Sequence, residues 1–380
     1  MEWLAYLVMG ALIGELLMGS RMQNRALGWG ALCGLLPLWY LVLWPFVDTA
    51  SRLWWHRGPT TSLVVIAVAS AALARPLAAR WSRDKVTPVR AGMFVFAVGC
   101  GHAVLACADG VGAAVLWPFL TQRVAFGHVH WGDPLVALPA AVCLVWLAFS
   151  RARKPQGRLR PKQRALLQQK HRKLWLWALG MFAGYLMFSA AMKFTAAAGF
   201  AADLNRLDAG AARRVVNPEP YSPYAWRAVV DRGEALWVGR RSVFQRPSTP
   251  VRWIVYPRGA EDARAFASDR EVVRVKASTD DYWIARKHNR GLWMADLRAG
   301  VLREFGLREH MVDHRMVRAW NFMPDAPKDR LVPAHAQTAE SMDRLSESIQ
   351  WIMGRDDGAD MVPRLAGVPG QFPELMRVVE

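Results

Sequence analysis

The segment RARKPQGRLRPKQRALLQQKHRK (residues 151–173), followed directly by LWLWALGMFAGYLMFSAAMKFT (174–195), decides the fold class. The first stretch holds ten Lys and Arg residues and no acidic residue, whereas the second is apolar apart from Lys193. An apolar run of about 20 residues is long enough to cross a bilayer as a helix. A basic loop beside such a run is typical of the cytoplasmic side of a membrane protein.

Five further apolar runs precede this one, so we expect a mainly α membrane bundle of about six transmembrane helices in residues 1–198. The runs cover roughly 3–18, 28–47, 61–78, 91–107, 134–150 and 174–195. Four cysteines lie within these runs or at their ends, and their spacing indicates neither a disulfide framework nor a metal motif. We expect them to pack as small hydrophobic side chains.

The basic residues of the connecting loops predict the orientation. Loops 19–27, 76–90 and 151–173 hold 2, 4 and 10 Lys and Arg residues, whereas loops 48–60 and 108–133 hold 2 and 1. The positive-inside rule places the richer group in the cytoplasm, so the N-terminus and the residues after 198 are expected outside. This distribution accounts for most of the net charge of +18 and disfavours nucleic acid as a partner, although nucleic-acid binding by residues 151–173 stays open as a third hypothesis.

Residues 199–380 have ordinary globular composition and predict a smaller extracytoplasmic α+β domain with an antiparallel sheet. Helical segments are expected at 196–215, 260–273 and 337–354, and HNRG (288–291) predicts a hairpin turn. His310 and His314 are interpreted as a solvated pair. The expected strands are 225–231, 235–244, 252–257, 281–287, 291–297 and 316–322.

Polar residues of the membrane half gather on its predicted outer side. His102 lies near the outer end of the fourth span, and His56 lies in an outer loop. His128, His130 and Asp133 lie in the other outer loop. Ionisable residues at such places are functional candidates by default. Glu15 also lies in a span, near its cytoplasmic end, and we expect it to pair with Arg21 or Arg25.

Several spaced motifs resemble the YdjM-like inner-membrane metal-dependent hydrolases, also described as LexA-binding, membrane-associated putative hydrolases. Family stretches of the form MDxLTHxLxGAxxGE, NRAxxxGxLxGLLPDxD, HRGxTHS and SHxLLDxxTxxG, with a later WPF and an R…DPL stretch, match this chain in order. The C-terminal part is also similar, through two further stretches. The matching stretches are MEWLAYLVMGALIGE (1–15), NRALGWGALCGLLPLWY (24–40), HRGPTTS (56–62), GHAVLACADGVG (101–112), WPF (117–119), Arg123 with DPL (133–135), NPEPYSPYAWRAVVD (217–231) and WVGRRSVF (237–244).

The departures from the family pattern fall on its presumed metal ligands, which are His and Asp. The resemblance implies that only His56, His102 and Asp133 remain of that set. His128 and His130 are the candidate replacements if a site survives, because alternate positions on an extended strand point the same way. The positions where a ligand of the family is replaced here are Tyr6, Leu38, Tyr40, Thr61, Ala106 and Gly127. A hydrolytic metal site needs three or more ligands and an open position for water.

Two interpretations follow from the resemblance. The first is a degenerate, non-catalytic member of the family in the bacterial inner membrane, with a binding or scaffold role and no metal. The second is an active hydrolase of a lipid-linked or periplasmic ester or phosphoester, in which the five residues above hold Zn or Mn. The expected partners are the bilayer, anionic lipid at residues 151–173 and a membrane protein, with no nucleic acid.

Overall fold

The computed structural model describes ten stretches of the chain, which are residues 2–35, 57–130, 133–153, 161–219, 222–246, 248–288, 291–299, 318–322, 331–333 and 377–379. The chain divides into two compact units. The first unit consists of Met1–Leu43 and Trp55–Ser189, and the second consists of Trp44–Trp54 and Ala190–Glu380. The boundary lies inside the long helix α7, so one helix belongs to both units.

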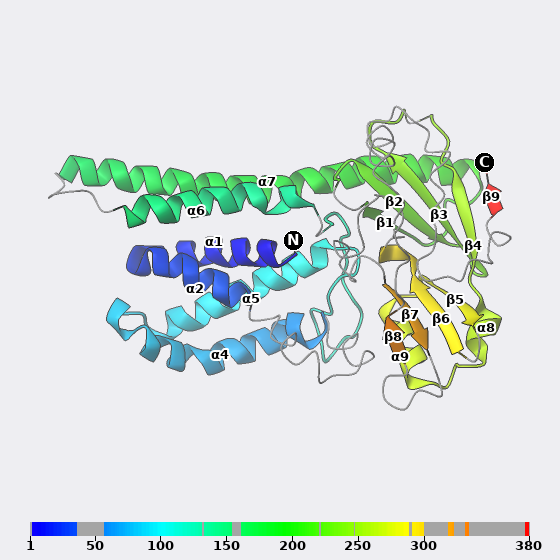
Figure 1. Cartoon of the computed structure of the whole chain (residues 1–380), viewed down its shortest axis with the longest axis horizontal. Coiled ribbons are helices and arrows are strands. Elements are labelled where there is room, and N and C mark those ends of the chain that lie inside the picture. The colour runs from blue at the N-terminus through cyan, green and yellow to red at the C-terminus, as the bar shows by residue number, and fades with distance from the viewer. Residues whose placement is uncertain are drawn as a thin grey trace. The chain divides into compact units, whose positions relative to one another are not determined.

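Helices dominate the first unit (Figure 1). Four of them are long and apolar enough to cross a membrane: Trp3–Met22, Leu63–Arg80, Pro88–Ala108 and the 46-residue α7. The described helices of this unit are α1 (Glu2–Met22), α2 (Asn24–Leu35), α4 (Leu63–Arg80), α5 (Pro88–Ala108), α6 (Leu138–Ala152) and α7 (Pro161–Arg206).

The expected six spans are therefore supported only in part. The run 134–150 forms a 3-10 turn (Pro134–Val136) and the 15-residue helix α6, which is shorter than a usual span. Asp133 caps the start of the turn, and Ala137, with φ of −130°, separates the turn from α6. The run 28–47 begins in α2 and then leaves the described residues.

α1 and α2 form a tight antiparallel pair. The turn between them is made at Gln23, which has a positive φ of 49°. Gly10 and Gly14 of α1 face Gly30 and Gly34 of α2 so closely that a Cβ atom on Gly30 would overlap the carbonyl oxygen of Gly10. Small residues spaced four apart let two helix backbones approach in this way.

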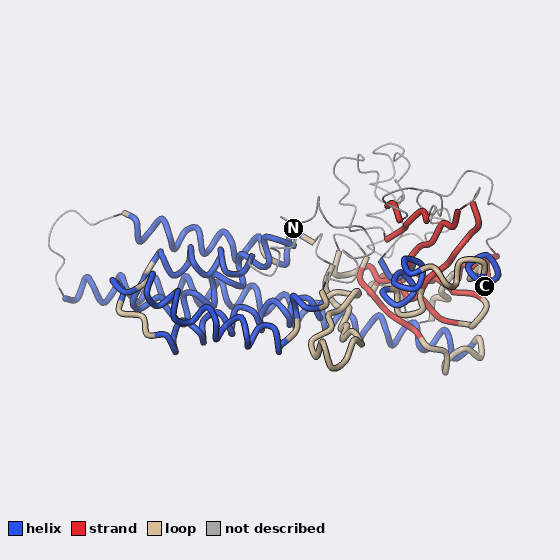
Figure 2. The backbone as a smooth tube through the Cα atoms, turned by 90° about the horizontal axis from the view of Figure 1, so that it is seen from below, coloured by secondary structure: helices blue, strands red, loops and turns tan. Residues whose placement is uncertain are grey.

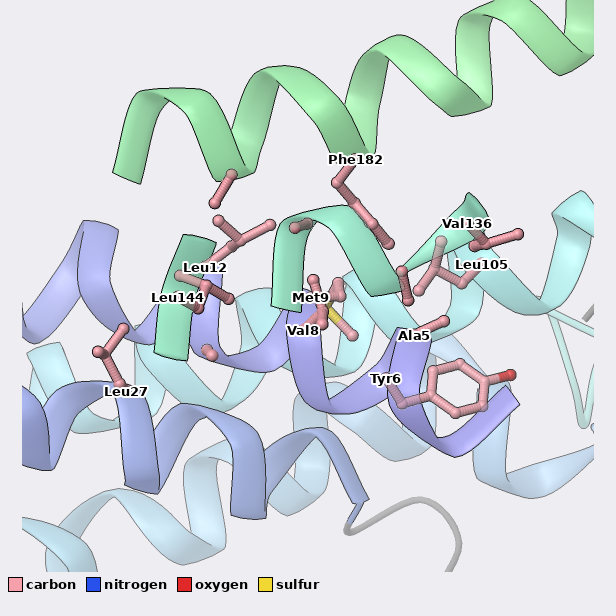
Figure 3. Packing of buried hydrophobic residues seen from close by; sticks show 14 of the residues in the cluster. Ala5, Tyr6, Val8, Met9, Leu12, Leu27, Leu105, Val136, Leu144 and Phe182 are labelled. Atoms are coloured by element: carbon pink, nitrogen blue, oxygen red, sulfur yellow. The ribbon is translucent and has the colours of Figure 1, made fainter. Parts of the chain in front are cut away.

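The core of the bundle lies where α1, α6 and α7 meet. Figure 3 shows Leu12 of α1 beside Leu144 of α6, and Phe182 of α7 pointing into the bundle as part of the same cluster. Leu27 of α2 and Leu105 of α5 extend the same cluster. Side chains from five helices are thus interlocked, which fixes the helix positions that carry the polar residues described below.

Ion pairs and hydrogen bonds connect the C-terminal part of α1 and the start of α2 to other segments of the bundle. Glu15 accepts two hydrogen bonds from Arg151 of α6, with N–O distances of 2.7 and 2.8 Å. The expectation that Glu15 pairs with Arg21 or Arg25 is therefore wrong. Arg25 instead pairs with Asp84 at 2.8 Å, and Arg21 donates to the carbonyl of Lys85. Arg21 and Arg25 lie 6 and 10 positions after Glu15, whereas residues that meet on one helix face lie three or four positions apart. Tertiary packing instead brings Arg151 of α6 beside Glu15.

The second unit contains two antiparallel sheets, and Figure 2 shows the described strands gathered there. The five-stranded sheet has the order β1-β2-β3-β4-β9, and the four-stranded sheet has the order β5-β6-β7-β8. The strands are β1 (Arg214–Pro218), β2 (Ala225–Asp231), β3 (Ala235–Ser242), β4 (Trp253–Pro257), β5 (Trp283–His288), β6 (Gly291–Asp296), β7 (Arg318–Phe322), β8 (Leu331–Pro333) and β9 (Arg377–Val379).

Alternating side chains arrange this unit in four layers. Trp226 and Trp253 of the first sheet pack against Phe200 near the end of α7. The opposite face of that sheet packs on the second sheet, for example through Val229 and Trp293. The outer face of the second sheet is covered by α8 (Ala260–Arg264) and α9 (Arg270–Ser278). Both faces of β2 and β6 are therefore buried, which explains their nearly continuous burial.

The six expected strands are present, and the pairing of His288 with Gly291 confirms the hairpin at HNRG. Three expectations were wrong. The helix predicted to residue 215 ends at Arg206, because Asp208 adopts a positive φ and β1 begins at Arg214. The segment 260–273 forms two short helices, α8 and the beginning of α9, instead of one helix, and the strands form two sheets instead of one. The segment 337–354, His310 and His314 lie outside the described residues.

Candidate functional site

The described part of the HRGPTTS motif is buried against the segment that follows α5. Residues 57–62 are all buried, and Pro59–Thr61 form a single 3-10 turn before α4. The amide of Ala114 donates to the carbonyl of Arg57 at 2.9 Å, and the amide of Leu63 donates to the carbonyl of Val115 at 2.9 Å. Backbone hydrogen bonds therefore join the segment before α4 to the segment after α5.

Arg57 and Asp109 form an ion pair at this junction. Arg57 is buried, and its Nη1 donates to Oδ2 of Asp109. The other carboxylate oxygen of Asp109 accepts the amide of Gly110 at 2.6 Å. Sequence reasoning missed this pair, although the signal was present as an Arg in HRG and an acid just after the fourth apolar run. The carboxylate is thus already engaged by two donors of the chain.

His102 lies beneath an aromatic ring. It is 3% exposed, and its imidazole stacks on Tyr6 of α1 with ring centroids 4.0 Å apart and an interplanar angle of 25°. Tyr6 is itself only 1% exposed. His102, a predicted site residue, is therefore in contact with Tyr6, which stands where the family pattern has a histidine.

Asp133 is buried and is held through both carboxylate oxygens. Oδ1 accepts the amide of Leu135 at 2.9 Å, and Oδ2 accepts the hydroxyl of Tyr185 from α7. These bonds start the turn before α6 and fasten it to α7. Hydrogen bonds to both oxygens hold the carboxylate of Asp133 in one position.

His128 and His130 are half-buried, and their backbones are part of the same network. The amide of His128 donates to the carbonyl of Ala108 at 2.9 Å, and its own carbonyl accepts the hydroxyl of Ser189. The imidazole of His128 lies 6.4 Å from the ring of Phe126, centroid to centroid. The carbonyl of His130 accepts the amide of Asp133 at 3.0 Å.

The first 196 residues decide the family of the chain. The model described as YdjM inner membrane protein matches residues 1–196, which is more than half of the 380 residues. The chain belongs to the YdjM inner membrane protein family. No curated protein and no solved structure shows significant similarity to it. The family and the four long apolar helices make it a multi-pass membrane protein of the inner membrane.

In this YdjM family member, the predicted metal ligands are only partly within the described residues. His102, His128, His130 and Asp133 are described, whereas His56 is not. Within the described stretches, no group of three or more His, Cys, Asp or Glu side chains is arranged to hold an ion. The full five-residue set stays a prediction.

Proposed function

We propose that this YdjM family member is a non-catalytic inner-membrane protein with a binding or scaffold role. The observation that carries the proposal is the stack of Tyr6 on His102. Tyr6 stands where the resemblance places a histidine ligand, and its ring covers one face of the imidazole. A neutral phenol is a much weaker ligand for zinc or manganese than an imidazole.

The residues at other positions of the family's presumed ligands favour the same conclusion. Thr61 and Ala106 are buried and stand where the resemblance places His and Asp. The hydroxyl of Thr61 donates to the carbonyl of Gly58 at 3.1 Å, and an alanine offers no donor atom. Asp133 has both oxygens engaged by Leu135 and Tyr185. The residues present therefore fit a divalent metal poorly, since a catalytic ion needs three ligands and charge compensation.

A lipid-binding role for the basic segment is part of the proposal. Lys162, Lys170, Arg172 and Lys173 are exposed along the first part of α7. A row of cations beside a transmembrane helix attracts anionic lipid headgroups by about 1 kcal/mol per residue. We propose that this segment faces the cytoplasm, that the N-terminus and the second unit lie outside, and that the bundle holds a membrane-protein partner.

If the helices of this chain keep the arrangement of the family, restoring the missing His and Asp ligands should create a metal site. The triple variant Tyr6→His, Thr61→His and Ala106→Asp supplies three of the ligands that the resemblance expects and that this chain lacks. We expect the purified full-length variant to retain roughly ten times or more zinc per chain than the unchanged protein after dialysis, as measured by mass spectrometry of the metal, because mutation of ligands or their supports changes affinity by factors of about 10–100.

The same triple variant with His102→Ala is the control, and it should lose the gain. Thr61→His alone provides a smaller gain if the triple variant does not fold. Equal zinc in the unchanged protein and the restored variants would contradict the proposal, because the missing ligands would then not matter.

A further inference from the structure

The loop of residues 115–126, between α5 and α6 in Figure 1, exposes a group of large apolar side chains. Phe119, Leu120 and Phe126 are 77%, 54% and 53% exposed, and Leu116 and Val124 are also exposed. The sequence of this loop contains a single charged residue, Arg123. An apolar patch of this kind usually marks a surface that contacts a protein or a membrane.

Backbone hydrogen bonds hold the 115–126 loop in a defined shape. Ala113 and Val124 form an antiparallel bridge, with N–O distances of 3.0 and 2.9 Å. The amide of Phe126 donates to the carbonyl of Cys107, near the end of α5, at 2.6 Å. The exposed apolar side chains are therefore carried by a backbone that is fastened to α5.

The loop is also attached to the first residue of α4, and this attachment sets its depth in a bilayer. The amide of Leu63 donates to the carbonyl of Val115 at 2.9 Å. α4 has 18 residues, so it is about 27 Å long, whereas the hydrocarbon core of a bilayer is about 30 Å thick. When α4 crosses the bilayer, Leu63 therefore lies at the edge of the core, and Val115 lies at the same depth.

The apolar surface of the loop adjoins the exposed surface of a helix that is long and apolar enough to span a membrane. Leu63 and Val64, the first two residues of α4, are 38% and 37% exposed, and Leu63 is hydrogen-bonded to the residue that precedes Leu116. In an inner-membrane protein, exposed apolar side chains of a spanning helix face lipid. The same medium is thus within reach of the loop.

We propose that the 115–126 loop inserts its exposed apolar side chains among the phospholipid acyl chains of the leaflet in which α4 begins. Phenylalanine and leucine are typical of segments that lie in the membrane interface. The loop backbone stays at the depth of the headgroups, because free amide and carbonyl groups are not tolerated among acyl chains. This lipid contact does not depend on whether the protein binds a metal.

Photo-crosslinking of the full-length protein in vesicles of phosphatidylethanolamine and phosphatidylglycerol tests the proposal. Phe119 is replaced by the photoreactive p-benzoyl-phenylalanine, and lipid adducts are detected by mass spectrometry of the intact protein. We expect lipid adducts in an amount similar to that given by the same replacement at Phe96, an exposed residue of the spanning helix α5.

Val273 provides the comparison outside the bundle. It is an exposed residue of α9, which covers the face of the second sheet turned away from α7 and the first sheet. Adducts from this position should be at least about tenfold fewer, because burial of a large apolar side chain shifts a partition equilibrium by that factor or more.

Leu120 is a second position for the photoreactive residue and should also give lipid adducts, including when the Phe119 variant does not fold. Crosslinks from both positions to a second copy of the chain or to the second unit, without lipid adducts, would overturn the proposal. The absence of adducts at both positions, while Phe96 gives lipid adducts, would overturn it as well, because the loop would then lie in water.

Discussion

Replacing Gly30 by leucine is expected to separate α1 from α2 and to destabilise the whole bundle. An added Cβ would overlap the backbone carbonyl of Gly10 and lie about as close to the backbone of Ala11 as two atoms tolerate, at 3.0 Å from its Cα. Backbone atoms cannot rotate away as a side chain does, so the helices must move apart. Overpacking of a core costs about 1–3 kcal/mol when side chains can adjust, and the cost here should be at the upper end or above it.

Gly28 provides a matched control on the same helix. It is exposed, and an added Cβ at this position meets no atom within 4 Å. The thermal midpoint of the full-length protein in detergent should fall by roughly 10 °C or more for Gly30→Leu and by only a few degrees for Gly28→Leu. Equal midpoints for the two variants would show that α1 and α2 are not packed through this glycine contact.

Removing the charge of Asp296 is expected to destabilise the second unit by about 3 kcal/mol or more. Asp296 is 1% exposed, and its oxygens accept the Nε and Nη2 of Arg298, each at 3.0 Å. Arg298 also donates to the carbonyl of Ser278 at 2.9 Å. Asp296→Asn leaves this buried guanidinium with only the exposed Asp280, 4.0 Å away, as a counter-charge, and removing one partner is the costly way to break a buried pair.

An exposed aspartate in the same unit gives the comparison. Asp281 has a side chain that is 66% exposed and lies 4.0 Å from Arg213. Asp281→Asn should change the free energy of unfolding by less than about 1 kcal/mol. The double variant Asp296→Asn with Arg298→Met should recover part of the lost stability, because it also removes the buried positive charge that paired with Asp296. A double variant no more stable than Asp296→Asn would argue against this electrostatic account.

The sequence predicted those parts of the fold that depend on local patterns. The apolar runs gave the long helices α1, α4 and α5, and local caps explain where two of them begin. Ser62 accepts the amide of Val65 at the start of α4, and Thr87 accepts the amide of Arg90 at the start of α5. Alternating apolar residues between turn residues predicted six of the strands.

The missed features depend on contacts between distant residues. Glu15 and Arg151 are 136 positions apart, so no local spacing could indicate their pairing. The division of the strands into two sheets depends on which faces bury together, which periodicity within one strand does not specify. β1 follows the end of α7 after a short turn, and its first residues, Arg214 and Val215, fell inside the helix predicted to residue 215.

The contacts of the candidate site residues could not be predicted from the sequence. His102 was singled out and is buried, but its stacking on Tyr6 joins residues from α1 and α5. Asp133 was singled out as a ligand, which stays a prediction, and its carboxylate caps a turn and accepts a hydrogen bond from Tyr185. The ion pair of Arg57 with Asp109 was not anticipated, because sequence alone does not show that the two motifs pack together.

Metal analysis of the purified, unmodified full-length protein tests the central claim most directly. The protein is isolated from membranes without chelator or added metal, and bound zinc and manganese are measured per chain. The proposal predicts that neither metal approaches one ion per chain. A tightly held stoichiometric ion that is lost in His56→Ala and in His102→Ala would contradict it and would establish the predicted His and Asp residues as a working metal site.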